Sequence, residues 1–214
     1  MISLSSFRSR PRRGAAWFLF ARPSLVVLAF AAVLAGCGDG ADYRRYSGST
    51  MGTYYEVTAR CPLDVSADIE EELLQVNAEM STYLPDSALS RFNRAPIGEW
   101  FAVPETLVEV VAAAETLSRE SAGAFDVTVG PLVNLWGFGP PKVDRPPTAA
   151  EVEDALARVG YTHLEVRWQP PALRKQADLY VDLSGIAKGH GVDRVVSRLR
   201  QQGCESMLVD IGGD

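Results

Sequence analysis

The segment 180–193 carries the densest set of groups that could bind an anion. An apolar run ends at a carboxylate, Asp182, and Ser184 is followed by a predicted helix that begins near Gly185 and has Lys188 in its first turns. The free N–H groups at a helix start, the positive end of the helix dipole and a lysine together stabilise a phosphate or pyrophosphate. Asp182 is expected to be an exposed carboxylate at a strand end, placed for a hydrogen-bond donor or a metal.

Hydrophobic periodicity predicts the elements that position this segment. The predicted strands cover 54–60, 162–168, 178–183 and 206–211, with the middle two paired through a proline-containing loop. The predicted helices run over 66–81, 104–120, 148–160 and 185–202. Ser66 is expected to cap the first helix, and Thr148 with Glu151 forms a capping box for the third. Strands with hairpin-like spacing among helices indicate an α+β fold.

The first 36 residues are typical of a bacterial export signal rather than of the fold. A basic region is followed by a short apolar run and by Leu34-Ala35-Gly36-Cys37. This layout is similar to a lipobox, in which Cys37 is lipidated, and residues 37–47 would form a polar tether. A plain signal peptide with an incidental cysteine is the alternative, and the pair Arg12-Arg13 gives little support to twin-arginine export.

Charge argues against one class of partner. The leader holds five of the 21 basic residues and none of the 27 acidic ones, so residues 37–214 carry a net charge of −11. Nucleic acid is therefore not expected as a partner, because binding it requires a basic surface. A single anionic ligand remains compatible, since a local site can oppose the overall field.

The remaining cysteines and the last residues leave questions open. Cys61 and Cys204 could pair in an oxidising compartment or remain two buried thiols, and spacing does not decide between these. No Cys/His cluster has zinc-ligand spacing. The last residues, an apolar run followed by Gly212-Gly213-Asp214, are typical of the start of a turn, so we expect a fragment of a longer protein.

Several segments together resemble the FAD:protein FMN transferase family, the ApbE-like flavin transferases. They occur in the family's order, and the resemblance covers roughly residues 48–214. The segments are Met51-Gly52-Thr53, Met80-Ser81-Thr82-Tyr83, Ser87-Ala88-Leu89-Ser90-Arg91-Phe92-Asn93, the run from Ala124 to Gly139, the segment 180–193 and Ile211-Gly212-Gly213-Asp214.

The resemblance implies a single ApbE-like, T-fold-like α+β domain over 48–214. It implies an exported enzyme that binds FAD and Mg²⁺ and transfers FMN to a Ser or Thr of a client protein, releasing AMP. The implied clients are flavoprotein subunits of membrane redox complexes, and the implied location is the periplasmic side of the bacterial inner membrane, through a lipid anchor. Relatives continue past residue 214 with a histidine motif and the Asp/Thr side chains that complete the Mg²⁺ site, so we expect the catalytic groups to lie there and the present chain to be inactive or unstable.

Carried over residue by residue, the resemblance places FAD at Met51, Tyr83, Ala124, Phe125 and Asp126. From the residues alone, Met51 could equally be a buried strand-start side chain and Tyr83 a cover for the helix end. Asp126 could accept hydrogen bonds from FAD or cap a turn. The nearby aromatics Trp136 and Phe138 are interpreted first as packing residues, with pocket walls as the alternative, and Arg91 and Asn93 as local structure rather than ligand contacts.

The same resemblance assigns FAD contacts to Asp182 and Lys188 and a Mg²⁺-bound backbone carbonyl to Gly185. Without it, Lys188 would be an ordinary solvated lysine. Gly189 and Gly191 each cost a helix about 1 kcal/mol relative to alanine, so a reason such as close ligand approach is expected. His190 is interpreted as wall or surface and not as a general base.

Two other functions stay open. One is an FAD pyrophosphatase that gives FMN and AMP on the same site. The other is a non-catalytic FAD-binding lipoprotein.

Overall fold

The computed structural model describes residues 42–213. The predicted signal peptide and Cys37 lie outside the described residues. In chain order the elements are β1 (Arg44–Thr50), β2 (Thr53–Arg60), α2 (Ser66–Met80), α3 (Ala88–Asn93), β3 (Phe101–Ala102), α4 (Glu105–Glu120), α5 (Gly130–Leu135), α6 (Ala149–Leu156), η2 (Tyr161–His163), β4 (Leu164–Arg167), β5 (Ala172–Lys175), α7 (Ala187–Gln201) and β6 (Ser206–Ile211).

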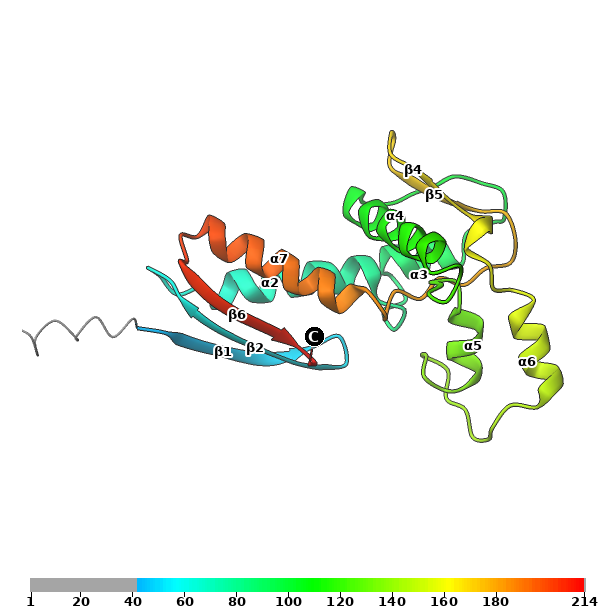
Figure 1. Cartoon of the computed structure of the whole chain (residues 1–214), viewed down its shortest axis with the longest axis horizontal. Helices are drawn as coiled ribbons and strands as arrows, with labels where there is room; N and C mark the ends of the chain where they lie inside the picture. The colour runs from blue at the N-terminus through cyan, green and yellow to red at the C-terminus, as the bar shows by residue number, and fades with distance from the viewer. Residues whose placement is uncertain (1–41, 214) are drawn as a thin grey trace, which may run out of the picture. The chain divides into compact units, whose positions relative to one another are not determined.

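One sheet and two helices form the first region of the described chain. Strands β1, β2 and β6 form an antiparallel sheet with β2 in the centre. Helices α2 and α7 pack together and cover one face of this sheet (Figure 1). Strand β1 begins at Arg44, inside the range predicted to be tether. The side chains buried between the two layers are Tyr55, Val57, Ala59, Val65, Ile69, Leu73, Val195, Leu199, Cys204 and Ile211.

Helix α2 follows the predicted periodicity. Ile69, Leu73, Val76 and Met80 are buried on one face, as expected from their helical spacing. The predicted cap is wrong, because Val65 is the N-cap and Ser66 is already helical. The acidic face of α2 pairs with the basic face of α7, through Glu72 with Arg194 and Asp68 with Arg198.

The second region is built on α3, α4 and a small sheet of strands in the order β3-β5-β4. Helix α4 packs on β4 and β5, and its buried face carries the predicted residues Leu107, Val108, Val111 and Ala114. The predicted Leu117 is exposed instead.

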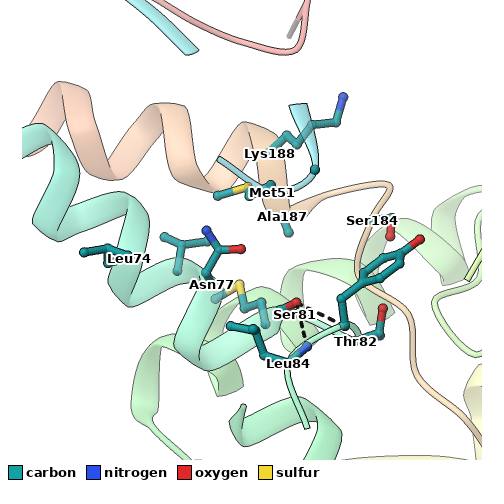
Figure 2. A pocket seen from close by; sticks show the side chains of 13 residues that line it. Met51, Leu74, Asn77, Ser81, Thr82, Leu84, Ser184, Ala187 and Lys188 are labelled. Atoms are coloured by element: carbon teal, nitrogen blue, oxygen red, sulfur yellow. Dashed lines mark hydrogen bonds between the residues drawn. The ribbon is translucent and has the colours of Figure 1, made fainter. Parts of the chain in front are cut away.

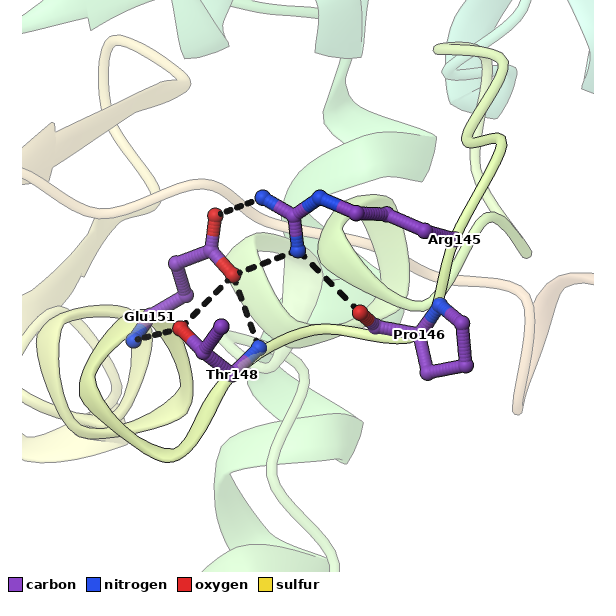
Figure 3. A network of polar contacts seen from close by, with 4 residues as sticks. All are labelled: Arg145, Pro146, Thr148 and Glu151. Atoms are coloured by element: carbon purple, nitrogen blue, oxygen red, sulfur yellow. Dashed lines mark hydrogen bonds and ion pairs between the residues drawn. The ribbon is translucent and has the colours of Figure 1, made fainter.

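Helix α6 begins with the predicted capping box. The Thr148 hydroxyl accepts from the Glu151 backbone N–H, and the Glu151 carboxylate accepts from the Thr148 backbone N–H and hydroxyl and from the Arg145 guanidinium (Figure 3). The helix ends at Leu156 rather than at Gly160. A 3₁₀ turn, Tyr161–His163, follows and leads into β4.

The predicted strand pair 162–168 and 178–183 is wrong in its second member. β4 pairs with Ala172–Lys175 directly across the loop that contains Pro170 and Pro171. In the segment 178–183 Tyr180 makes one isolated parallel bridge, with Val129. An apolar run alone does not distinguish a strand from a buried extended segment, which is why the pattern misled the prediction.

Two further features concern the described part of the chain as a whole. Cys61 and Cys204 form a disulfide that joins the end of β2 to the residues just before β6, which answers the pairing question left open by the sequence.

Within residues 42–213, no helix has both the length and the apolar character needed to cross a membrane.

Candidate functional site

A pocket of about 470 Å³ opens where α2, the β1–β2 turn and the start of α7 meet. Figure 2 shows Leu74 and Asn77 of α2 on one side and Met51, Ala187 and Lys188 on the other. The full set of lining residues is Met51, Gly52, Leu74, Val76, Asn77, Met80, Ser81, Thr82, Tyr83, Leu84, Ser184, Ala187 and Lys188. Three of the predicted FAD contacts, Met51, Tyr83 and Lys188, therefore come from distant parts of the sequence to one cavity.

Met51 occupies a two-residue hairpin turn. Its φ is 48° and that of Gly52 is 74°, the left-handed values typical of a type I′ turn, where Asn or Gly is usual. A methionine is uncommon there, and its side chain packs partly against both hydrophobic cores while lining the pocket. A Cβ on Gly191 would lie 3.0 Å from the Met51 Cε and 3.1 Å from the Ile211 Cδ1. Gly191 is therefore explained by the packing of these side chains, whereas a Cβ on Gly189 would meet open space.

Tyr83 is held at the pocket rim by both of its ends. Its backbone N–H donates to the Ser81 Oγ at 3.1 Å, and its hydroxyl donates to the Phe138 carbonyl at 2.7 Å. The residue is 60% exposed, so the face of its ring remains available to a planar ligand. Trp136 and Phe138 are also exposed, at 52% and 77%, so their interpretation as packing residues is wrong. The chain turns between them at Gly137, whose φ is 78°.

Lys188 places a positive charge on the pocket beside the start of α7. It is the second residue of this helix, whose first N–H groups and dipole favour an anion at the same end. The position of Lys188 at the start of a helix agrees with the prediction for the segment 180–193, although the helix begins at Ala187 rather than near Gly185.

Asp182 differs from the expectation. The residue is buried, at 6% exposure, and its Oδ1 accepts from the Ser184 backbone N–H at 2.8 Å. The prediction of an exposed carboxylate is wrong, because the residue ends a buried segment and its side chain closes a turn. Asp182 does not line the pocket, but its partner Ser184 does.

The run Ala124-Phe125-Asp126 also lies outside the set of lining residues. The Asp126 Oδ1 accepts from the Thr128 backbone N–H and hydroxyl, both at 2.7 Å, and its Oδ2 accepts from the Tyr161 backbone N–H at 3.0 Å. These contacts fit the turn-capping alternative. Phe125 packs partly against the core, and its ring Cε2 would lie 3.2 Å from a Cβ on Gly185.

Gly185, the predicted metal ligand, is exposed in the turn before α7. Mg²⁺ requires near-octahedral coordination by oxygen, which one carbonyl does not supply. Among residues 42–213 there is no group of three or more His, Cys, Asp or Glu side chains that could hold a metal. The residues described therefore do not by themselves fit a Mg²⁺ site.

His190 does not line the pocket. It is half-buried on α7, and burial, with a contribution from the positive charge of Arg194, lowers the pKa of its imidazole. The interpretation of His190 as a pocket wall is therefore not supported by its position.

Several lining residues were not predicted. Asn77 donates to the Thr50 Oγ1 and to the Leu73 carbonyl, both at 3.1 Å, and so ties α2 to the hairpin. Leu74 is 69% exposed although it is apolar and lies on α2. Leu74 lies off the apolar face that the other large apolar side chains of α2 form. This departure from the amphipathic pattern was the signal in the sequence that could have indicated a binding surface. The other lining residues, to which the sequence assigned no ligand contact, are Gly52, Val76, Met80, Ser81, Thr82, Leu84, Ser184 and Ala187.

Comparison with known proteins identifies the family. A family model described as "ApbE family" matches residues 51–214, which is most of the chain. The chain belongs to the ApbE family. The expected α+β fold and the resemblance drawn from the sequence motifs are thereby confirmed.

Relatives and solved structures agree with this assignment. The chain is 44% identical to the FAD:protein FMN transferase of Vibrio cholerae over 198 residues, covering 89% of this chain and 59% of the relative. It is 39% identical to that of Haemophilus influenzae over 202 residues, covering 89% and 58%. The solved flavin transferase ApbE from Vibrio cholerae matches with a TM-score of 0.77 and 45% identity, over 80% of this chain and 58% of that one.

The apo flavinyl transferase ApbE from Pseudomonas stutzeri matches with a TM-score of 0.75 and 38% identity, over 80% of this chain and 59% of that one. The chain thus spans somewhat less than two thirds of the length of these relatives.

Proposed function

We propose that this protein acts as an FAD:protein FMN transferase, with FAD as the donor substrate. The observation that carries the proposal is the convergence of Met51, Tyr83 and Lys188 on one pocket. The relatives named FAD:protein FMN transferase support the same activity.

The pocket is suited to a dinucleotide with planar rings and a pyrophosphate. The exposed face of Tyr83 and the thioether of Met51 offer apolar and polarizable contacts to a ring. Lys188 and the start of α7 offer positive charge to the pyrophosphate. Binding that holds the FMN phosphorus in a fixed position would favour attack by a second substrate, because phosphoryl transfer depends mainly on positioning and electrostatics.

The reaction joins the client hydroxyl to the FMN phosphorus. The Ser or Thr oxygen forms a P–O bond, the P–O bond to the bridging oxygen of the pyrophosphate breaks, AMP leaves, and the hydroxyl proton is released. In this chain Lys188 would stabilise the negative charge on the phosphates, while Met51 and Tyr83 would orient the donor.

Dependence on Mg²⁺ is part of the proposal but rests on the family alone. Gly185 offers its carbonyl in the turn beside the pocket-lining Ser184. The residues described offer Mg²⁺ this one carbonyl and do not complete its coordination.

Product analysis tests the proposed activity. The complete protein, with any residues that follow position 214, is incubated with FAD, Mg²⁺ and a client flavoprotein subunit, and the client is examined by mass spectrometry. A mass gain of one FMN with release of AMP is expected. Free FMN and AMP without client labelling would instead indicate a pyrophosphatase, and FAD binding without AMP release would indicate a non-catalytic FAD-binding protein. Either of these results contradicts transfer.

We also propose that the protein is anchored through lipidated Cys37 on the periplasmic side of the inner membrane, where subunits of membrane redox complexes would be its clients. The disulfide between Cys61 and Cys204 supports an oxidising compartment. Cell fractionation after metabolic labelling with a fatty acid tests this. Label in the wild type and its loss in Cys37→Ser are expected, and an unlabelled wild type would contradict the anchor.

A further inference from the structure

The side chain of Asn93 forms both backbone hydrogen bonds of a residue 88 positions away. Its Oδ1 accepts from the Val181 N–H at 2.8 Å, and its Nδ2 donates to the Val181 carbonyl at 2.9 Å. Asn93 is the last residue of α3, and both residues are buried. The amide therefore gives Val181 the same pair of bonds that a neighbouring strand would provide.

Val181 needs such a partner because it lies in no strand. Its exposure is 0%, and a buried peptide group without a hydrogen bond costs about 1–3 kcal/mol. The residues beside it are held differently: Tyr180 by its bridge to Val129 and the Asp182 N–H by the Val127 carbonyl at 2.8 Å. At Val181 the asparagine takes the place of a strand.

Asn93 is itself fixed by a buried lysine. The Lys175 Nζ donates to the Asn93 carbonyl at 2.6 Å, and the residue is 4% exposed. Burial lowers the pKa of the Lys175 ammonium group. The contact connects the end of α3 to β5 and thereby fixes the backbone from which the Asn93 side chain extends.

A short series of contacts connects the Asn93–Val181 hydrogen bonds to the pocket. Asp182 follows Val181 and accepts from the N–H of Ser184, which lines the cavity. The Leu183 carbonyl then accepts from the N–H groups of Ile186 and Ala187, where α7 begins. The position of Lys188 thus depends on where Val181 is held.

We infer that Asn93 is a positioning residue for the segment 181–188, which carries the pocket wall with Ser184, Ala187 and Lys188. Its effect on FAD binding rests on the proposed function, whereas its effect on the segment does not. Asn93 is not among the lining residues, so it acts through the backbone of Val181.

Two variants of the full chain test the inference. Asn93→Ala removes both bonds, and Asn93→Asp keeps the size and one acceptor but replaces the donor to the Val181 carbonyl. Val57→Ala, in the core beneath the first sheet, is the control for general loss of stability. Amide hydrogen exchange is measured along the chain at a temperature where all variants remain folded, and the FAD dissociation constant is measured in the same samples.

Faster exchange over 181–187 with unchanged exchange in β2 is expected for both Asn93 variants, and the reverse pattern for Val57→Ala. The FAD dissociation constant is expected to rise about tenfold in the Asn93 variants, as loss of a buried hydrogen bond predicts. Unchanged protection of 181–187 in both Asn93 variants, or the same loss in Val57→Ala, would overturn the inference. If the wild type itself fails to bind FAD, the proposed function fails, and the exchange pattern alone decides the role of Asn93.

Discussion

The two walls of the pocket are built in different ways. The first wall consists of Met51 and Gly52, in the turn of a regular hairpin, and of Leu74 and Asn77, on the long helix α2. The second wall belongs to the residues from Val181 to Lys188, which pass through a buried extended segment and a turn before α7 begins. The first wall is made by repeating backbone hydrogen bonds, whereas the second is held by a few separate contacts, from the side chains of Asn93 and Asp182 and from single backbone bonds to Val127 and Val129.

This difference decides how each wall responds to substitution. In a regular hairpin or helix many residues contribute backbone hydrogen bonds, so substituting one exposed residue has a small effect on stability. A segment held by Asn93, Asp182 and one bridge at Tyr180 has few contacts that can replace a lost one. A substitution near the first wall should therefore change the free energy of unfolding with little effect on the pocket, whereas one near the second wall should also displace pocket residues.

The largest expected effect on stability lies in the first region. Replacing both cysteines, Cys61→Ser with Cys204→Ser, opens a link between positions 143 residues apart. The free energy of unfolding should fall by about 4 kcal/mol, because the unfolded chain regains its freedom. Denaturant unfolding measures this loss. FAD affinity at low temperature should stay within about twofold of wild type. A larger change would show that the disulfide affects the geometry of the pocket as well as the stability of the fold.

Gly130→Ala tests the second wall. A Cβ there would lie 2.3 Å from the Tyr180 ring and 2.5 Å from the Tyr180 carbonyl oxygen. Since a backbone atom cannot move aside as a side chain does, stability should fall by about 3 kcal/mol. Thermal unfolding gives the stability, and amide exchange over 181–187 should rise in the folded protein. A variant as stable as wild type would show that this segment tolerates displacement.

Gly191→Ala is expected to weaken FAD binding with little change in stability, the opposite of the double cysteine replacement. The added Cβ meets the flexible ends of Met51 and Ile211, and alanine improves helix propensity by about 1 kcal/mol. The stability change should therefore stay within about 1 kcal/mol of zero, while the displaced Met51 weakens FAD binding. Gly189→Ala, whose Cβ meets open space, is the matched control on the same helix. Equal FAD affinity in the two variants would argue against a contact between Met51 and the ligand.

The smallest effect is expected at the α6 cap, away from both walls. The guanidinium of Arg145, followed by the N–H and hydroxyl of Thr148, lowers the pKa of Glu151 from 4.5 to about 2 (Figure 3). A lowered folded-state pKa stabilises the protein above pH 4.5, and that contribution is lost as the pH falls from 4.5 through 2. Thermal unfolding of Glu151→Gln should show less acid destabilisation than wild type over this range.

Glu153→Gln, an exposed glutamate on the same helix, is the control for the acid experiment. Identical acid profiles for Glu151→Gln and wild type would show that the network in Figure 3 does not contribute to stability.

The helix and strands that carry the first wall could largely be predicted from the sequence, although Leu74 and Asn77 were not predicted as lining residues. The buried face of α2, the strand 53–60 and the final strand follow periodicities that local sequence determines. The capping box at Thr148 was also predicted correctly, because its two partners lie three residues apart.

The second wall could not be predicted in the same way. Its apolar run suggested a strand, but the partners of Val181 and Tyr180 lie at Asn93 and Val129, at separations that no local pattern encodes. Asn93 was interpreted as local structure, which its distant contact with Val181 corrects. The engagement of Asp126 by Thr128 and Tyr161 was one of two alternatives, and composition could not choose between them.

The most direct test of the account is the affinity of the full chain for FAD in wild type, Lys188→Met and Lys142→Met. Lys142 is an exposed lysine outside the pocket and serves as the matched control. The account predicts saturable binding that Lys188→Met weakens about tenfold, with a smaller dependence on salt, while Lys142→Met matches wild type. Equal affinities for all three proteins, or no binding by the wild type, would contradict the claim that this pocket holds the dinucleotide.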